Sequence, residues 1–183
     1  GADVAAILRE LVEAKPDLIV LQEATLDAAP LRAHFDGWHF HHAGEYLVAA
    51  RWPVTMKDAC RTRDFGRATA ILCEIEHPDG EFLVADVHLT TARYGLTHLR
   101  PDSPLTGEGI EALLEHQRLR EQEAARTSEF VAAIDPGKPL LVLGDFNMPV
   151  SSSLFQQHWG GLASAFDASG WGYGYTAPCN TSG

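Results

Sequence analysis

The sequence predicts an α/β (α+β) fold in which sheets and helices form a layered sandwich. Short β-rich runs recur along the chain, and helical patterns occur at its beginning and in its second half. These elements do not follow the strict strand–helix alternation of a parallel sheet. A length of 183 residues fits one domain with a sizeable core, and no repeat or linker divides the chain. We therefore expect residues 1–183 to form a single domain.

Apolar spacing and turn residues set the elements of the first half. The first helix is predicted by the spacing of Val4, Ile7, Leu8 and Leu11. Pro16 ends this helix, and a strand follows at residues 18–21. Residues 27–37 predict a loop with about one helical turn, and residues 38–42 and 46–50 predict two strands.

The second half combines a predicted hairpin with a long helix. Residues 68–75 and 82–89 are β-rich, and the "HPDGE" between them is a hairpin signal, so these strands should be antiparallel neighbours. Residues 90–109 predict a long loop, and residues 108–134 predict a helix. A last strand is expected at residues 140–143.

Three apolar runs end in polar residues. "LIVLQEA" contains Glu23, "FLVADVHL" contains Asp86 and His88, and "LLVLGDFNMP" contains Asp145 and Asn147. Each ending has an ordinary structural explanation: a carboxylate that has reached solvent, a core histidine satisfied by hydrogen bonds, and an Asx turn. Together, however, these side chains form a set suited to metal binding and proton transfer. Carboxylate and amide oxygens suit Mg²⁺, whereas a zinc site would contain more His or Cys.

The strand period sharpens this interpretation. Asp145 and Asn147 are two apart, so an extended segment projects them to the same side, and Gly144 permits close backbone approach just before them. The same period places Asp86 and His88 on one face of a strand whose two faces both look buried. A buried polar side chain must be hydrogen-bonded or lie at a cleft.

The motifs "PDLIVLQEA", "VADVHLTTARYGL" and "LLVLGDFNMP", in this order, resemble the metal-dependent endonuclease/exonuclease/phosphatase superfamily. "LVAARWPV" and "GYT" add to the resemblance, which covers nearly the whole chain. It implies a sandwich of two mixed β-sheets flanked by helices. It also implies a divalent-metal-dependent hydrolase of phosphoric esters, a class that includes nucleases, phosphodiesterases and phosphatases.

The resemblance also implies residue roles. Glu23 would ligate Mg²⁺ or Mn²⁺, and Asp145 would orient or deprotonate the attacking water. Asn147 would hold that aspartate or the water, and His88 would hydrogen-bond a phosphoryl oxygen. Asp86 is not a motif position of the family, and we interpret it as structural.

Two further features have candidate roles in substrate binding. Arg93 follows His88 by five residues, and its planar guanidinium suits a phosphate, although a surface arginine explains it equally well. Tyr175 and Thr176 lie in a stretch that resembles the family's segment just before its last strands, which implies that they line the substrate pocket; aromatic packing under a loop is the alternative.

The ends of the chain depart from the family pattern. Family members begin with a strand that carries an Asn and end with an Asp on one strand and a Ser-Asp-His sequence on another. The last Asp of this sequence, Asp167, and the last His, His158, match neither position. We therefore expect a chain that is incomplete at both termini of the domain and, by itself, weakly active or inactive.

Composition limits the classes of partner. A net charge of −11 and the absence of a Lys/Arg stripe favour a small phosphodiester, a lipid headgroup or a phosphomonoester over duplex DNA, so nucleic acid is not favoured. The sequence contains no run of about 18 apolar residues of the kind that could span a bilayer. Cys60, Cys73 and Cys179 are too far apart to indicate a disulfide framework or a zinc knuckle. A noncatalytic domain that keeps the fold as a binding surface is the alternative function. No pattern indicates the localisation or the oligomeric state.

Overall fold

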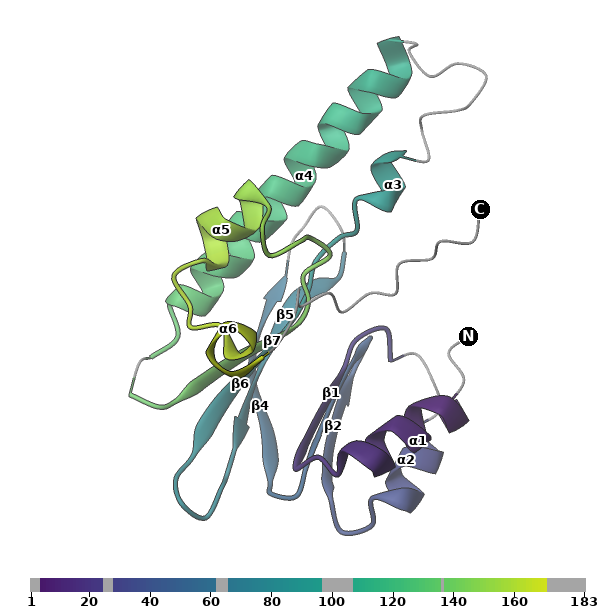
Figure 1. Cartoon of the computed structure of the whole chain (residues 1–183), viewed down its shortest axis with the longest axis vertical. Coiled ribbons are helices and arrows are strands. Elements are labelled where there is room, and N and C mark those ends of the chain that lie inside the picture. Colours follow the sequence, from purple (N-terminus) through teal and green to yellow (C-terminus); the bar gives the residue numbers. More distant parts are fainter. Residues whose placement is uncertain (1–3, 25–27, 62–65, 97–106, 136, 171–183) are drawn as a thin grey trace. The chain divides into compact units, whose positions relative to one another are not determined.

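The computed structural model describes residues 4–24, 28–61, 66–96, 107–135 and 137–170 (Figure 1). They fall into two compact units, Gly1–Met148 and Pro149–Gly183, and each unit is described by itself. The described strands all lie in the first unit. The expectation of one domain over residues 1–183 stays a prediction.

The first sheet is antiparallel in the described part of the chain. It contains β1 (Leu18–Leu21), β2 (His39–Ala43) and β3 (Tyr46–Ala50), in the order β1-β3-β2. Leu21 pairs with Leu47, and the backbone N–H of Ala24 donates to the carbonyl oxygen of Glu45 at 2.9 Å. The segment after β1 and the segment before β3 therefore lie at the same end of the sheet.

The second sheet is mixed. It contains β4 (Val54–Arg61), β5 (Ala68–Ile75), β6 (Phe82–His88) and β7 (Leu140–Asp145), in the order β4-β5-β6-β7. Strands β4, β5 and β6 pair antiparallel, and β6 and β7 pair parallel. The predicted hairpin between residues 68–75 and 82–89 is confirmed, and so is the fold class with its two sheets and flanking helices.

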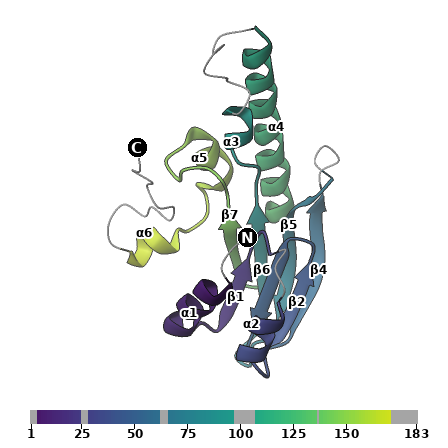
Figure 2. The same ribbon diagram turned by 90° about the vertical axis from the view of Figure 1, so that its right-hand side faces the viewer.

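The core of the first unit lies between the two sheets. Its buried members come from β3, β5 and β6 and are Tyr46, Val48, Ala50, Ile71, Cys73, Ile75 and Val84. The other face of the first sheet is covered by α1 (Val4–Ala14) and α2 (Ala29–His34), where Leu31 is fully buried (Figure 2). Sheets and helices thus form the layers that the sequence predicts.

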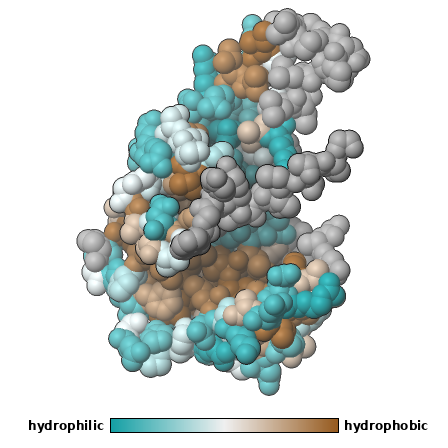
Figure 3. Space-filling view, viewed as in Figure 1, coloured by the Kyte–Doolittle hydropathy of each residue, from teal (hydrophilic) through white to brown (hydrophobic). Residues whose placement is uncertain are grey.

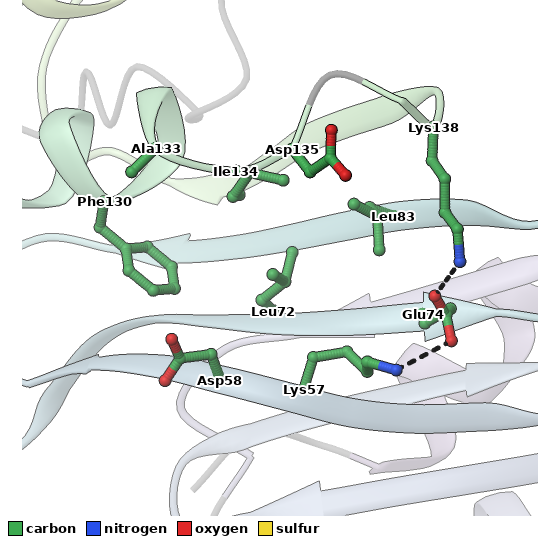
Figure 4. Close-up of a pocket in the computed structure, with 10 residues that line it drawn as sticks. All are labelled: Lys57, Asp58, Leu72, Glu74, Leu83, Phe130, Ala133, Ile134, Asp135 and Lys138. Atoms are coloured by element: carbon green, nitrogen blue, oxygen red, sulfur yellow. Dashed lines mark hydrogen bonds and ion pairs between the residues drawn. The ribbon is translucent and has the colours of Figure 1, made fainter.

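The C-terminal part of helix α4 (Gly107–Ala132) packs on the outer face of the second sheet, and the rest of the helix extends beyond the strands (Figure 2). Its Thr127 hydroxyl is hydrogen-bonded to that of Thr69 in β5 at 2.7 Å. Near the end of α4, an open hollow of about 330 Å³ separates the helix from the sheet, with Phe130 over Leu72 (Figure 4). Glu74 at its rim accepts hydrogen bonds from Lys57 and Lys138.

Short helices complete the described chain. Helix α3 (Arg93–Leu96) follows β6, and α5 (Ser153–Trp159) and α6 (Ala165–Ser169) belong to the second unit. Ser152 caps α5 by accepting a hydrogen bond from the Phe155 N–H at 3.2 Å. None of the helices that the structure describes is both long and apolar enough to cross a membrane.

Strand β4 was not among the elements predicted from the sequence. Its pairing with β5 shifts register between Met56 and Asp58 and again between Cys60 and Arg61. Each such irregularity breaks the period-two alternation by which a strand is recognised in a sequence. Helices α5 and α6 were not predicted either. Each has a single serine cap as its start signal and lacks the long apolar periodicity by which a helix is recognised. Tyr175 and Thr176 lie outside the described residues.

Strand β7 is an edge strand within the described residues, although its sequence is that of a core strand. Figure 3 shows an apolar area where β1, β6 and β7 lie in Figure 1. Leu141 of β7 is 47% exposed. The aliphatic run that predicts a buried strand is therefore only partly covered.

Gly144 allows β7 to approach β6 closely. It pairs with Val87 in the parallel register and has a φ of +138°. A Cβ atom on Gly144 would lie 1.9 Å from the Val87 carbonyl oxygen, which no side chain can tolerate without movement of the backbone. The close approach that the sequence indicates at this position is confirmed.

We expect Gly144→Ala to lower the free energy of unfolding by about 3 kcal/mol or more, because it adds a steric clash to an unfavourable φ. Chemical denaturation measures the change. Gly80→Ala is the matched control, since Gly80 has a φ of +136° but no heavy atom within 4 Å of the added Cβ. Equal losses in the two variants would contradict a role for close strand approach.

Candidate active site

Four of the predicted polar residues lie at one end of the first unit's sandwich. Strands β1, β6 and β7 end there, while β3 and β5 begin there. Glu23 follows β1, His88 ends β6, and Asp145 ends β7. Because parallel neighbours end at the same edge of a sheet, the pairing of β6 with β7 places Asp145 opposite His88.

His88 lies between two carboxylates. Its Nε2 is 3.9 Å from Glu23 Oε1, and its Nδ1 is 3.3 Å from Glu45 Oε1. The ring is only 6% exposed, and Nδ1 has no aligned hydrogen-bond partner among the described residues. Its closest charged neighbour on that side is therefore the Glu45 carboxylate.

Glu23 combines exposure with a strained backbone. Its side chain is 82% exposed, and its φ is +53°, in the left-handed region that glutamate rarely occupies. Such a conformation costs roughly 1–3 kcal/mol and persists only where the surrounding structure enforces it. The hydrogen bond from the Ala24 N–H to the Glu45 carbonyl oxygen, just before β3, holds the chain in place immediately after Glu23.

Asp145 and Asn147 form a turn that is anchored to the segment after β6. Asp145 Oδ1 accepts a hydrogen bond from the Asn147 N–H at 2.9 Å, so the Asx turn expected as an alternative is present. Asn147 has a φ of +51°, and its Nδ2 donates to the Leu89 carbonyl oxygen at 2.8 Å. Among the described residues, the second carboxylate oxygen of Asp145 has no hydrogen-bond partner.

A charged network behind His88 was not predicted from the sequence. Arg67 donates to Glu45 Oε1 and to the His88 carbonyl oxygen, each at 2.9 Å. It also donates to Thr90 Oγ1 and to Glu123 Oε1. The only local signal for Arg67 is an arginine just before a β-rich run, and a single charged residue at a strand end resembles a surface residue.

Asp86 is buried between the sheets below His88. Its Oδ1 accepts a hydrogen bond from Gln22 Nε2 at 2.6 Å, and its Oδ2 has no hydrogen-bond partner in the part of the chain that the structure describes. Burial raises the pKa of Asp86 to about 7, the Gln22 hydrogen bond lowers it, and the charge of Glu45 raises it. This environment agrees with the structural role expected for Asp86.

Arg93 is not tied to the other predicted residues. It begins α3, its side chain is exposed, and its backbone N–H donates to Thr91 Oγ1 at 3.4 Å. No described contact joins Arg93 to Glu23, His88 or Asp145. Its role in substrate binding therefore stays a prediction.

The donor set at this site fits a hard divalent cation held by few protein atoms. Among the described residues, no group of three or more His, Cys, Asp or Glu side chains is arranged to enclose a metal ion. Mg²⁺ is usually bound by one or two carboxylates together with water and substrate phosphate. The exposed carboxylate of Glu23, beside His88, is of this kind.

The comparison with protein families matches residues 1–183 to the Endonuclease/Exonuclease/phosphatase family. The chain belongs to this family. Members of the family hydrolyse phosphoric esters and generally use divalent metals. The curated relative YbhP of Escherichia coli K12, an uncharacterized protein, is 28% identical over 158 residues. This match covers 77% of the present chain and 59% of YbhP, so the chain spans about three fifths of that relative.

Solved structures of the family share this fold. A β-hairpin deletion mutant of the Staphylococcus aureus β toxin has a TM-score of 0.53 and 14% identity, covering 86% of this chain and 63% of the toxin. Zebrafish (D. rerio) TDP2, solved with a single-strand DNA product, has a TM-score of 0.53 and 12% identity. That match covers 87% of this chain and 58% of TDP2. The Neisseria meningitidis 3'-5' exonuclease NExo has a TM-score of 0.50 and 23% identity, covering 79% and 53% of the two chains.

Asp86 should make the stability of the protein fall as the pH rises. Its folded pKa lies above the ordinary value of 3.8, so its stabilising contribution is complete below that value and is lost as the pH rises toward 7. Asp86→Asn removes this dependence. We expect the stability of the variant relative to wild type to increase by on the order of 3 kcal/mol between pH 4 and pH 7.

Denaturant unfolding at several pH values measures this difference. Asp79→Asn in the exposed hairpin between β5 and β6 is the control and should leave the pH dependence unchanged. Parallel stability profiles for wild type and Asp86→Asn would contradict the raised pKa of Asp86.

Proposed function

We propose that this protein is a divalent-metal-dependent hydrolase of phosphoric esters and that Glu23, His88, Asp145 and Asn147 form its active site. The observation that carries the proposal is the meeting of these residues at one end of the sandwich. The His88 ring faces Glu23, and Asp145 is its partner in the strand register. Family membership supports the reaction class.

His88 is placed to stabilise a phosphoryl oxygen. Its Nδ1 faces the Glu45 carboxylate, and its Nε2 points to the side of Glu23. A donor fixed in this way can hydrogen-bond to an oxygen on which negative charge develops during hydrolysis. Losing one such donor typically costs about 10²–10³-fold in rate.

Asp145 is proposed to orient or deprotonate the attacking water. Asn147 engages one of its carboxylate oxygens through a backbone N–H, which leaves the other oxygen for the water. The Asn147 side chain donates to the Leu89 carbonyl oxygen and so fixes the turn on the segment that follows His88. Asn147 therefore holds Asp145 through its backbone and holds the two segments together through its side chain.

Glu23 is proposed to be the ligand of Mg²⁺ or Mn²⁺ in the described part of the chain. When bound, such an ion supplies Lewis-acid stabilisation of charge on the phosphate. The left-handed backbone at Glu23 orients the carboxylate away from the core and toward solvent, where a phosphoric ester has access. This strain is consistent with selection for a site rather than for stability.

The charge of the protein favours small substrates. A net charge of −11 disfavours long polyphosphate backbones, so we expect a small phosphodiester, a lipid headgroup or a phosphomonoester to be preferred over duplex DNA. Arg93 is proposed to contact the phosphate. TDP2 in complex with a single-strand DNA product and the exonuclease NExo are the reasons for including single-stranded DNA in a substrate panel.

We expect Asp145→Ala and Asn147→Ala each to lower kcat by about 10²–10³-fold while the fold is kept. Hydrolysis of bis-p-nitrophenyl phosphate in Mg²⁺ provides the rate, and near-UV circular dichroism monitors the fold. Asp79→Ala in the exposed hairpin is the control. Because the chain spans about three fifths of YbhP, a longer form of the protein is assayed beside it. Activity of both site variants within a few-fold of wild type would refute the assigned roles.

Metal binding can be tested separately from turnover. We expect Glu23→Gln to weaken Mn²⁺ binding by about 10–100-fold, because a neutral amide replaces the carboxylate ligand. Titration with Mn²⁺, followed by water-proton relaxation, measures the affinity. Glu76→Gln, an exposed position after β5, is the control. If wild type binds no Mn²⁺, a noncatalytic binding domain becomes the better interpretation.

A further inference from the structure

Helix α4 carries two buried charged residues, Arg120 and Glu123, that contact the segments next to the candidate site. Arg120 is 9% exposed and Glu123 is 1% exposed. They are at positions i and i+3, which places them on the same side of the helix. A buried charge is costly unless it is paired and hydrogen-bonded. The partners of these two residues therefore indicate what the charges are for.

Arg120 joins the two segments that carry the proposed catalytic residues. Its Nε donates to the Thr90 carbonyl oxygen, two residues after His88, and its Nη2 donates to the carbonyl oxygen of Asn147. Both distances are 3.0 Å. The planar guanidinium can hold two acceptors at a fixed separation, whereas the ammonium group of a lysine acts as a single point charge.

Glu123 binds the same Thr90 through the residue's N–H and hydroxyl groups. Its Oε2 accepts from the Thr90 N–H at 2.6 Å, and its Oε1 accepts from Thr90 Oγ1 at 3.1 Å and from Arg67 Nη2 at 3.2 Å. Arg67 in turn donates to Glu45, whose carboxylate faces Nδ1 of His88. A continuous chain of contacts therefore runs from Glu123 to the His88 ring.

We propose that Arg120 and Glu123 are positioning residues for the reaction proposed above. Arg120 sets the separation between the segment after His88 and the turn at Asn147. Glu123 fixes Thr90 and, through Arg67, holds the Glu45 carboxylate against the His88 ring. Neither residue contacts the reacting atoms. The inference rests on the proposed function, and it adds that the geometry of the site depends on α4.

The exposed neighbours of these residues supply matched controls on the same helix. Arg118 is 73% exposed and pairs with Glu115, and Glu129, six residues beyond Glu123, is exposed. Arg118→Lys and Glu129→Gln therefore make the same chemical changes away from the contacts of Arg120 and Glu123.

The first experiment measures the kinetics of Arg120→Lys and Glu123→Gln beside these controls. We expect kcat to fall by about 10–100-fold in both site variants with KM within about threefold, since the reacting groups are displaced and substrate contacts are kept. Lysine cannot bridge both carbonyls, and a glutamine amide places N–H groups against partners that are themselves donors. The controls should keep wild-type kcat. Equal kcat values in site and control variants would overturn the proposal.

A second readout does not depend on turnover. In Arg120→Lys and Glu123→Gln we expect faster hydrogen exchange at the Thr90 amide and changed ¹⁵N shifts of the His88 ring, and in the controls neither. If wild type proves inactive, the proposed function fails while these measurements still decide the positioning role. Unchanged Thr90 exchange and His88 shifts would overturn it. Loss of the native near-UV circular dichroism spectrum in Arg120→Lys would also overturn it, because the residue would then be needed for folding itself.

Discussion

The parallel pairing of β6 with β7 is the constraint on which the site depends. It places Asp145 opposite His88, and Gly144 makes it possible because any side chain there would meet the Val87 carbonyl oxygen. Side chains alternate along a strand, so a shift of β7 by one residue would turn Asp145 to the face of the sheet opposite His88. On the proposed function, the aliphatic residues that precede Gly144 and His88 act indirectly, by fixing the register in which the polar residues lie.

Packing also explains why the site lies at the end of the sandwich. The middle of β6 is buried on both faces, and a polar side chain there must be neutral or paired, as the Gln22–Asp86 hydrogen bond and the raised pKa of Asp86 illustrate. Where the strands end, solvent reaches the chain, so a charged side chain there has a smaller desolvation cost. The positive φ values of Glu23 and Asn147 occur at this boundary, where neighbouring hydrogen bonds can enforce them.

The sequence predicts the elements that local periodicity controls and misses those that depend on contacts distant in sequence. Strands β1, β3 and β5 appear at the expected residues, and so do the polar endings that bring Glu23, His88 and Asp145 together. Strand β4 does not, because its bulges break the alternation. Glu45, Arg67 and Glu123 each follow a pattern that also fits a surface residue. Only the folded chain joins them, across sequence separations of 22 and 56 residues.

The same network engages the two arginines nearest the site, Arg67 and Arg120. Arg67 is paired with Glu45 and Glu123, and the guanidinium of Arg120 donates to the carbonyl oxygens of Thr90 and Asn147 and to the Gln117 side chain. These two arginines therefore hold the site in shape and leave little charge to attract a phosphate, in a protein whose net charge is already −11. On the proposed function, binding an anionic ester requires a positive charge from another source. The exposed Glu23 carboxylate is placed to recruit it as a divalent cation, which explains why an acidic residue lies where an anionic substrate is expected.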